Sequence, residues 1–311
     1  MTETKLINKI DFAPISIEDK ELYESYLAAE SLRGCEFSFA NLYLWGRQSF
    51  AVVHNHIALF SQFNRRSVYP YPIGVGDKRA VIDSIIADSK ARGISCRITG
   101  LSEEAREEIE EMYPGKFRFH SDEGSFDYVY DINDLADLVG KRYQAKRNHL
   151  NRFKEAFPSC KAEPICESNI SMVREFANDW YASRLKENPD ADYHMERAAL
   201  EKAFRDYKRL GMEGLALISG DEVLGFTFAS RLSFDTFDVH FEKALSEVQG
   251  SYAAINQALA RYIRDKYPSV RYLDREEDMG LEGLRKAKLS YHPHHMVKKW
   301  WACLLEEGYD Y

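Results

Sequence analysis

Hydrophobic and polar positions alternate along this chain with two different periods, and both periods recur in each half of the sequence. Apolar residues spaced three and four apart indicate amphipathic helices, whereas short apolar runs bounded by turn residues indicate strands. In the first part, helices are expected at residues 17–33, 77–92 and 103–112, and strands at 50–54, 57–62, 68–73, 94–98, 117–119 and 126–130. Gly93 is a stop signal for the second helix and Ser102 a cap for the third. This part of the chain is therefore α/β.

The pattern starts again after Asp131 and defines a second block. Helices are expected at residues 133–157, 170–185, 196–210 and 251–266, and strands at 214–219, 222–232, 236–243, 270–273 and 296–304. The order of elements is that of an N-acetyltransferase-like domain, and the first block resembles a looser version of it. We therefore predict two tandem acetyltransferase-like (GNAT-like) domains, residues 1–131 and 132–311, each a mixed sheet flanked by helices.

The segment 272–292 carries the densest run of charge next to a predicted strand. The strand stops at Asp274, and a helix introduced by Gly280 and Gly283 is expected to bury Leu281, Leu284 and Leu289. Open α/β sheets bind ligands at the carboxyl ends of their strands. The charged residues assigned to substrate binding are Arg275, Glu276, Glu277, Arg285 and Lys288. The alternative is a salt-bridged hub that joins strand to helix.

Composition limits the classes of protein that fit. A chain of 311 residues with 45% hydrophobic residues is long enough for about two globular domains. Its formal charge of −8 argues against a protein that binds nucleic acid over its whole surface. A local basic patch can still bind phosphates. The five cysteines are scattered without the short paired spacing of a zinc site, so we expect reduced thiols and no metal. Neither a signal peptide nor an apolar run of roughly 20 residues is present, which predicts a cytoplasmic protein.

A basic helix is the expected contact for a polyanion. Between Lys141 and Lys161 there are seven Lys or Arg residues and one acid, Glu155. The residues assigned to the donor and its phosphates in this segment are Lys141, Arg142, Lys146, Arg147, Asn148 and His149. Closely spaced cations on a helix suit the phosphates of a transfer RNA or of an anionic substrate, and the alternative is a solvated helix face.

A glycine loop before the 251–266 helix is the second candidate phosphate site. Gln249, Gly250, Ser251 and Tyr252 stand between a strand and a helix N-terminus, where free N–H groups and the helix dipole favour an anion. Acyltransferases of this fold hold the pyrophosphate of coenzyme A at the same turn, but Glu247 departs from their usual pattern. The alternative is that the glycine only starts the helix.

Three segments together resemble a known family. They are Lys141–Phe153, the hairpin at 226–243 and, above all, Asp274-Arg-Glu-Glu-Asp-Met-Gly-Leu-Glu-Gly-Leu-Arg-Lys-Ala-Lys-Leu-Ser-Tyr. They are similar to the bacterial uncharacterised family related to the C-terminal domain of phosphatidylglycerol lysyltransferase. The resemblance implies two tandem acetyltransferase-like domains. Relatives use this arrangement to move an aminoacyl group from charged transfer RNA onto an amine or hydroxyl of a lipid or peptidoglycan precursor, so the resemblance implies an aminoacyl transfer of this kind.

The functional hypothesis that follows is direct aminoacyl transfer. Glu242 and Asp274, at strand ends, are the candidate catalytic bases, and no cofactor is expected beyond the donor, aminoacyl-tRNA or acyl-CoA. Two alternatives remain: an acyl-CoA-dependent N-acyltransferase, and a binding module that keeps the fold without catalysis.

Overall fold

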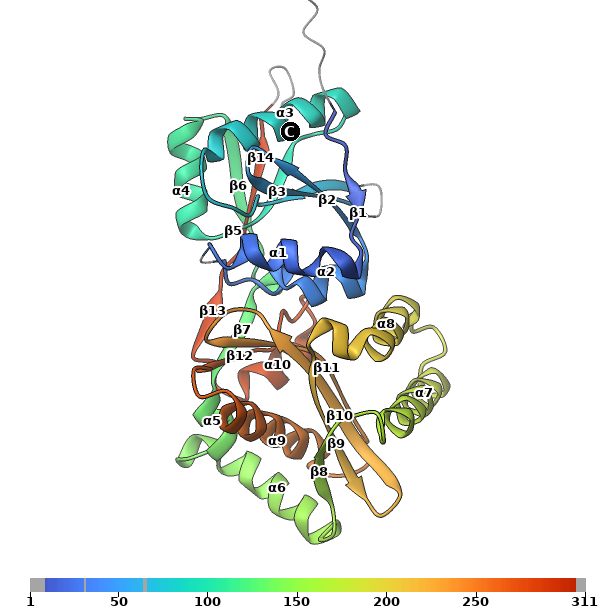
Figure 1. The fold of residues 1–311 in the computed structure, drawn as a ribbon. Coiled ribbons are helices and arrows are strands. Elements are labelled where there is room, and N and C mark those ends of the chain that lie inside the picture. Colours follow the sequence, from blue (N-terminus) through green and yellow to red (C-terminus); the bar gives the residue numbers. More distant parts are fainter. Residues whose placement is uncertain (1–8, 31, 64–65, 306–311) are drawn as a thin grey trace, which may run out of the picture. The chain divides into compact units, whose positions relative to one another are not determined.

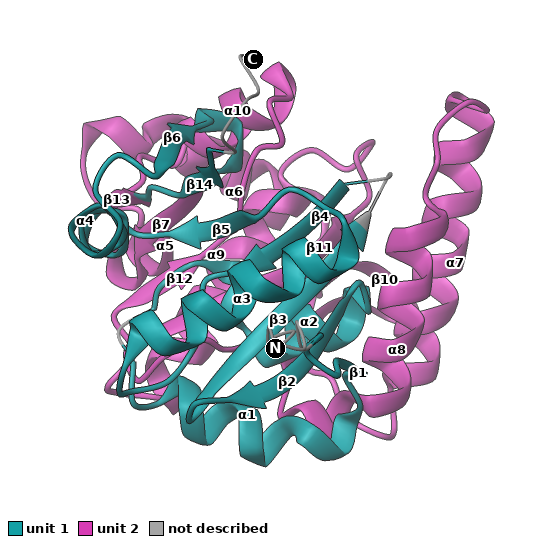
Figure 2. Cartoon of the chain, turned by 90° about the horizontal axis from the view of Figure 1, so that it is seen from above, with its two compact units in different colours: residues 1–126, 297–311 teal, residues 127–296 magenta. Residues whose placement is uncertain are grey.

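The protein divides into two compact units in the computed structural model, which describes residues 9–30, 32–63 and 66–305. Unit 1 comprises residues 1–126 and 297–311, and unit 2 comprises residues 127–296 (Figure 2). The sequence predicts one boundary, after Asp131, whereas the chain passes from unit 1 to unit 2 after Phe126 and returns after Met296. The predicted domains also include residues 1–8 and 306–311, which lie outside the described residues, as does Ser31 of the first predicted helix.

Unit 1 is a mixed sheet with helices packed on it. Its elements are β1 (Ala13–Pro14), α1 (Lys20–Leu27), α2 (Phe39–Trp45), β2 (Gln48–Val53), β3 (His56–Phe63), β4 (Arg66–Pro70), α3 (Lys78–Arg92), β5 (Arg97–Leu101), α4 (Glu103–Met112), β6 (Phe117–Ser121) and β14 (Trp300–Leu304), with 3-10 turns at Ile17–Asp19, Cys35–Phe37 and Glu123–Ser125. The Ser102 hydroxyl accepts a hydrogen bond from the Ala105 N–H at 3.1 Å, and Gly93 ends α3 in the left-handed conformation. Both predicted helix signals are confirmed.

The last strand of the described chain belongs to unit 1. The sheet order is β1-β2-β3-β4-β5-β14-β6, so β14 lies between β5 and β6 and is antiparallel to both (Figure 1). The sequence predicts one strand at 296–304 within the second domain. The structure instead has two strands there, because β13 (His295–Val297) joins the other sheet and Lys298 and Lys299 separate it from β14.

Unit 2 has a second seven-stranded sheet covered by helices. Its elements are β7 (Asp127–Asp131), α5 (Ile132–Asp137), a 3-10 turn (Lys141–Tyr143), α6 (Gln144–Ala156), β8 (Lys161–Pro164), α7 (Ile170–Glu187), α8 (His194–Leu210), β9 (Glu213–Ser219), β10 (Glu222–Arg231), β11 (Thr236–Ala244), α9 (Ser251–Lys266), β12 (Tyr272–Asp274), α10 (Glu282–Leu289) and β13. The order is β13-β7-β12-β11-β10-β9-β8, and β11 and β12 run parallel. No described helix is long and apolar enough to cross a membrane.

Two hydrophobic layers hold the sheet of unit 2. On one face α5, α6 and α9 form a core with strand residues that include Leu215, Val239 and Leu273. On the other face Phe226 and Phe228 of β10 lie against Phe204 of α8, with ring centroids 6.1 and 5.2 Å away. Apolar burial on both faces stabilises the long antiparallel strands that carry the candidate site.

The predicted helix at 133–157 is interrupted. Leu138 and Gly140 have φ values of 51° and 93°, which end α5 and start a new turn before α6. The prediction of one continuous helix is therefore wrong. In the structure, Tyr143, Leu150 and Phe153 of this stretch are all buried.

The buried side of α10 also differs from the prediction. Leu281 and Leu289 are 56% and 50% exposed, whereas Lys288 is 8% exposed. Lys288 turns inward because its ammonium group donates hydrogen bonds to the main-chain carbonyls of Arg275 and Glu276. A lysine ammonium group can be buried on a helix face, where a leucine was expected, when main-chain carbonyls accept its hydrogen bonds.

Gly250 is required where α9 begins. Its φ is 89°, and a Cβ built on it would lie 2.2 Å from the carbonyl oxygen of His149 in α6. The absence of a side chain thus allows the main chains of α6 and the loop before α9 to approach closely.

We predict that Gly250→Ala lowers the free energy of unfolding by at least ~2 kcal/mol, because strain at positive φ adds to the clash with α6. Gly220→Ala is the matched control: its φ is 63°, but no atom lies within 4 Å of the added Cβ. Urea denaturation of both variants measures the difference. Equal losses would contradict the close approach.

Candidate active site

Strand β11 contains a β-bulge at His240. Phe228 of β10 pairs with Phe241 and the next residue, Ala229, pairs with Val239, so His240 is the extra residue. A bulge changes which face the following side chains occupy, and bulges are frequent beside active sites. Polar side chains of β11 consequently contribute to polar groups on both faces of the sheet.

Glu242 forms the centre of the polar group on the α9 face. Its Oε1 accepts a hydrogen bond from the Arg275 guanidinium at 2.8 Å, and its Oε2 lies 3.4 Å from Nδ2 of Asn256 in α9. Side-chain exposure is 10% for Glu242 and 16% for Arg275. The guanidinium also lies 5.2 Å from the ring centroid of Tyr291 and 5.8 Å from that of Tyr130. An ion pair shielded in this way interacts more strongly than one on the surface.

Lys146 extends this group from α6. Its Nζ donates to the Ser290 hydroxyl at 2.7 Å and lies 3.7 Å from the ring centroid of Tyr291. Burial, followed by the nearby positive charge of Arg275, lowers the pKa of Lys146 to about 8. About a tenth of this amine is therefore neutral at pH 7, and about half at pH 8. We call Lys146, Glu242, Arg275 and Tyr291 the transfer cluster.

Asp274, the second candidate base, lies deeper. It ends β12, is completely buried, and accepts a hydrogen bond from the Glu276 N–H at 2.8 Å. In the ladder it is paired with Asp238 of β11 and Val129 of β7. Its position inside the sheet makes Glu242 the more accessible of the two carboxylates.

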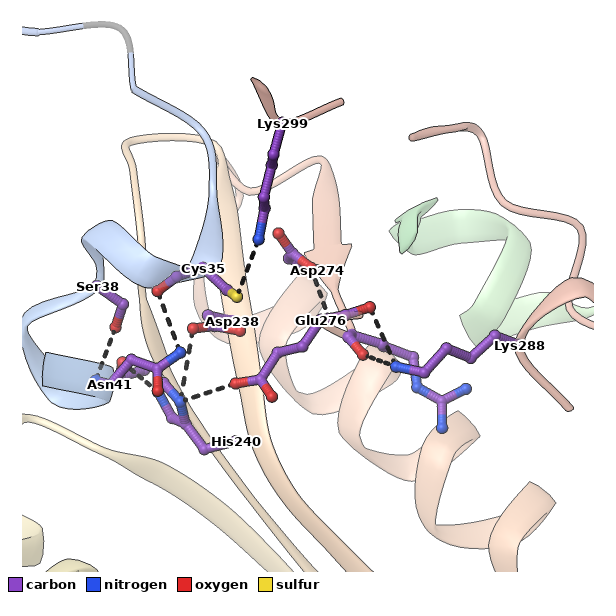
Figure 3. A network of polar contacts seen from close by, with 11 residues as sticks. Cys35, Ser38, Asn41, Asp238, His240, Asp274, Glu276, Lys288 and Lys299 are labelled. Carbon is purple, nitrogen blue, oxygen red and sulfur yellow. Dashed lines mark hydrogen bonds and ion pairs between the residues drawn. The ribbon is translucent and has the colours of Figure 1, made fainter. Parts of the chain in front are cut away.

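Arg285 and Lys288 have partners within unit 2. Arg285 donates to buried Asp278 at 2.7 Å, and Tyr128 donates to the same carboxylate at 2.6 Å. The Arg285 hydrogen bond, together with that from Tyr128, holds the pKa of Asp278 down at about 2. Burial lowers the pKa of Lys288, whose ammonium contacts main-chain carbonyls (Figure 3). This half of the segment has the contacts of a structural hub.

Glu276 and Glu277 belong to the turn that follows β12. Glu276 has a φ of 57°, and its Oε1 lies 3.6 Å from Nδ1 of His240 (Figure 3). Glu277 is half-buried. The turn directs Arg275 toward Glu242 and Glu276 toward His240.

The basic segment divides into inward and outward residues. Arg147 donates to the carbonyls of Leu138 and Gly140 and so fixes the loop before α6, while Arg142 pairs with Asp134 at 2.7 Å. The remaining side chains vary in exposure. Lys141, Asn148, Arg152 and Lys154 are exposed, and His149 is half-buried. The exposed cations, rather than Arg147, form the surface open to a polyanion.

The Gly250 loop is explained by packing. Ser251 is buried and donates its hydroxyl hydrogen to the Leu245 carbonyl at 2.7 Å. Gln249 is exposed and Tyr252 half-buried. Because Gly250 rests against α6, the glycine has a structural role that needs no bound phosphate.

The structure adds residues that the sequence did not single out. Tyr291, Asn256 and Tyr130 surround the Glu242–Arg275 pair, and Asp238 faces His240. Tyr291 lies at the end of the charged segment 272–292, and its aromatic side chain was the signal that the sequence offered for it. Asn256 lies 14 residues beyond Glu242 and only long-range packing brings the two together. A buried carboxylate, a guanidinium and a partly neutral amine on one face can position a carbonyl group and move a proton.

Comparison with known proteins identifies the relatives of this chain. A family profile described as "Phosphatidylglycerol lysyltransferase, C-terminal" matches residues 28–303. A crystal structure of a conserved protein of unknown function from Bacteroides thetaiotaomicron is 34% identical, with a TM-score of 0.89 over 95% of this chain and all of that one. An uncharacterized protein of Mycoplasmoides gallisepticum is 27% identical over 180 residues, which are 57% of this chain and 56% of that protein.

More distant structures share the fold. The structure described as L-PGS from Bacillus licheniformis is 15% identical, with a TM-score of 0.67 over 92% of each chain. FemX is 10% identical, with a TM-score of 0.60 over 95% of this chain and 98% of FemX. The predicted fold class, two tandem acetyltransferase-like domains with mixed sheets flanked by helices, is confirmed.

We predict a pH-dependent contribution of Lys146 to stability. Its pKa is about 8 in the folded chain and about 10.4 in an unfolded one. The unfolded state binds more protons between these values, so stability rises with pH across this window. Urea unfolding of wild type and Lys146→Met should give a difference, wild type minus variant, that increases from about pH 8 to pH 10.4. A difference that is constant or falls would contradict the lowered pKa.

Proposed function

Because this chain belongs to the family of the phosphatidylglycerol lysyltransferase C-terminal domain, we propose that it is an aminoacyltransferase. It moves an aminoacyl group from aminoacyl-tRNA to an amine or hydroxyl of a small acceptor. The observation that carries the proposal is the transfer cluster, in which Glu242, Arg275 and Lys146 meet at the strand ends of unit 2. The coarser class, an acyl or aminoacyl transferase, is the one that the family and the fold support.

The proposed reaction is direct attack on the donor ester. The acceptor nitrogen or oxygen attacks the carbonyl carbon, the ester C–O bond breaks, and the terminal ribose hydroxyl of the transfer RNA leaves with a proton. Orientation of the two reactants can supply roughly 7–11 kcal/mol of the barrier. Glu242 accepts the proton of the acceptor and passes it to the departing ribose oxygen, and Arg275 stabilises the negative charge that develops on the carbonyl oxygen.

The contacts of the transfer cluster support these roles. Glu242 and Arg275 are largely shielded from solvent, where electrostatic stabilisation is stronger than in water. The side chain of Lys146 lies near the same pair and is a cation below about pH 8 and a neutral amine above it. Asp274 as a second base stays a prediction, as do Arg285 and Lys288 as substrate contacts. The contacts of all three in unit 2 support a role in holding the segment.

The donor is proposed from the basic segment 141–154, which comprises the 3-10 turn and most of α6. Exposed Lys141, Arg152 and Lys154 offer a cationic surface on a chain of net charge −8. The Gly250 loop supports coenzyme A less well, because that glycine is explained by its contact with α6. An aminoacyl-tRNA donor therefore fits better than an acyl-CoA donor.

We predict that Glu242→Gln lowers turnover by about 10²–10⁴-fold, because the amide has the same shape but cannot accept the proton. Product formation is measured with labelled aminoacyl-tRNA and a panel of small amine and hydroxyl acceptors, and donor binding by filter retention. Glu247→Gln, an exposed residue of the loop before α9, is the control and keeps wild-type turnover. Unchanged turnover in Glu242→Gln would contradict the role of Glu242 as the base. Wild-type binding without transfer to any acceptor would favour the binding module.

We also predict that the double variant Arg152→Glu/Lys154→Glu loses most retention of labelled aminoacyl-tRNA at low salt, where phosphate contacts are strongest. Lys186→Glu/Lys208→Glu is the matched control, since it reverses two exposed charges on other helices, α7 and α8. Arg147 is unsuitable for this test because it holds the loop before α6. No retention by the wild-type protein would rule out the donor, and competition by excess coenzyme A would support the acyl-CoA alternative.

A further inference from the structure

We propose that Asp238, His240 and Glu276 of unit 2 form a binding site for a divalent transition-metal ion. The sequence predicts no metal for this chain, since its cysteines lack the short paired spacing of a zinc site. The three residues come together only through the bulge in β11 and the turn after β12. The proposal is independent of the proposed transferase function.

His240 is held in one orientation. Its Nε2 lies 2.7 Å from the hydroxyl of Ser230 in β10, and its side chain is only 1% exposed. Metal-binding histidines commonly have their second ring nitrogen fixed in this way, which sets the tautomer and directs the other nitrogen. The bulge turns the remaining nitrogen, Nδ1, toward the two carboxylates.

Nδ1 has no hydrogen-bond partner among the described residues, although it is buried. It lies 3.5 Å from Oδ2 of Asp238 and 3.6 Å from Oε1 of Glu276 (Figure 3). Both distances exceed the 2.7–3.2 Å typical of a hydrogen bond. Nearly all buried polar atoms have a partner, so this nitrogen indicates a missing group.

The spacing of the three atoms fits a small cation. Ligand atoms about 2.0–2.2 Å from a tetrahedral zinc ion lie roughly 3.3–3.6 Å from one another. The three donor atoms all lie within 4.8 Å of one another. If Nε2 donates its proton to Ser230, the lone pair of Nδ1 faces two carboxylates, and a cation between them removes that repulsion.

The chemistry of the donors defines the class of ion. One imidazole nitrogen and two carboxylate oxygens suit zinc, manganese or iron(II), whereas calcium and magnesium prefer oxygen ligands alone. Side-chain exposure is 0% for Asp238 and 23% for Glu276, so Glu276 offers the path by which an ion enters.

The test is zinc binding by the full chain after removal of metals with a chelator. Isothermal titration with Zn²⁺ should show a saturable site that weakens at least tenfold in His240→Gln and in Glu276→Gln. His295→Gln is the control, because exposed His294 and His295 lie with their Nδ1 atoms 2.9 Å apart and can bind zinc on their own. Titration with Co²⁺ should give visible absorption bands that His240→Gln removes and His295→Gln leaves.

Circular dichroism checks that each variant folds. If His240→Gln does not fold, Glu276→Gln decides the question, because its carboxylate is partly exposed and its replacement keeps the shape. Absence of saturable zinc binding would overturn the proposal. Binding that persists in both variants and is lost only in His295→Gln would overturn it as well.

Discussion

The parallel pairing of β11 with β12 is the constraint on which unit 2 depends. It sets Asp238 beside Asp274 and places two buried carboxylates at one level of the sheet. On the other side of β12, main-chain hydrogen bonds between Tyr128 and the residues Arg275 and Glu276 continue past the end of the strand. These hydrogen bonds fix the irregular turn to the main chain of β7.

This turn places two oppositely charged side chains, those of Arg275 and Glu276, in different polar groups. Arg275 reaches Glu242 on the face of α9, and Glu276, in a left-handed conformation, reaches His240. Removing one partner from a buried pair leaves an uncompensated charge, which typically destabilises a protein by about 3–5 kcal/mol. The segment after β12 is thus a candidate site in its first residues and a structural hub around Asp278 and Arg285, so the two readings of the sequence describe adjacent parts of it.

Local patterns in the sequence predict most helices and strands, because amphipathic spacing and caps such as Ser102 are local signals. They do not predict the break at Leu138, since leucine rarely adopts a positive φ without support from neighbouring elements. The bulge at His240 and the burial of Lys288 depend on partners 10 to 13 residues away. For the site, position at a strand end pointed to Glu242 and charge density pointed to Arg275, whereas the contact of Lys146 with Ser290 spans 144 residues and appears only in the folded chain.

The position of β14 has a consequence for the order in which the protein is made. This strand is among the last described residues to be synthesised, yet it fills the gap between β5 and β6, which are completed about 200 and 180 residues earlier. Until it arrives, both strands have open edges, and open edges invite pairing with other chains. Unit 2, whose residues are contiguous, can complete its sheet first. The sheet of unit 1, most of whose strands are synthesised first, therefore cannot be completed until the last strand of the other sheet, β13, has been made.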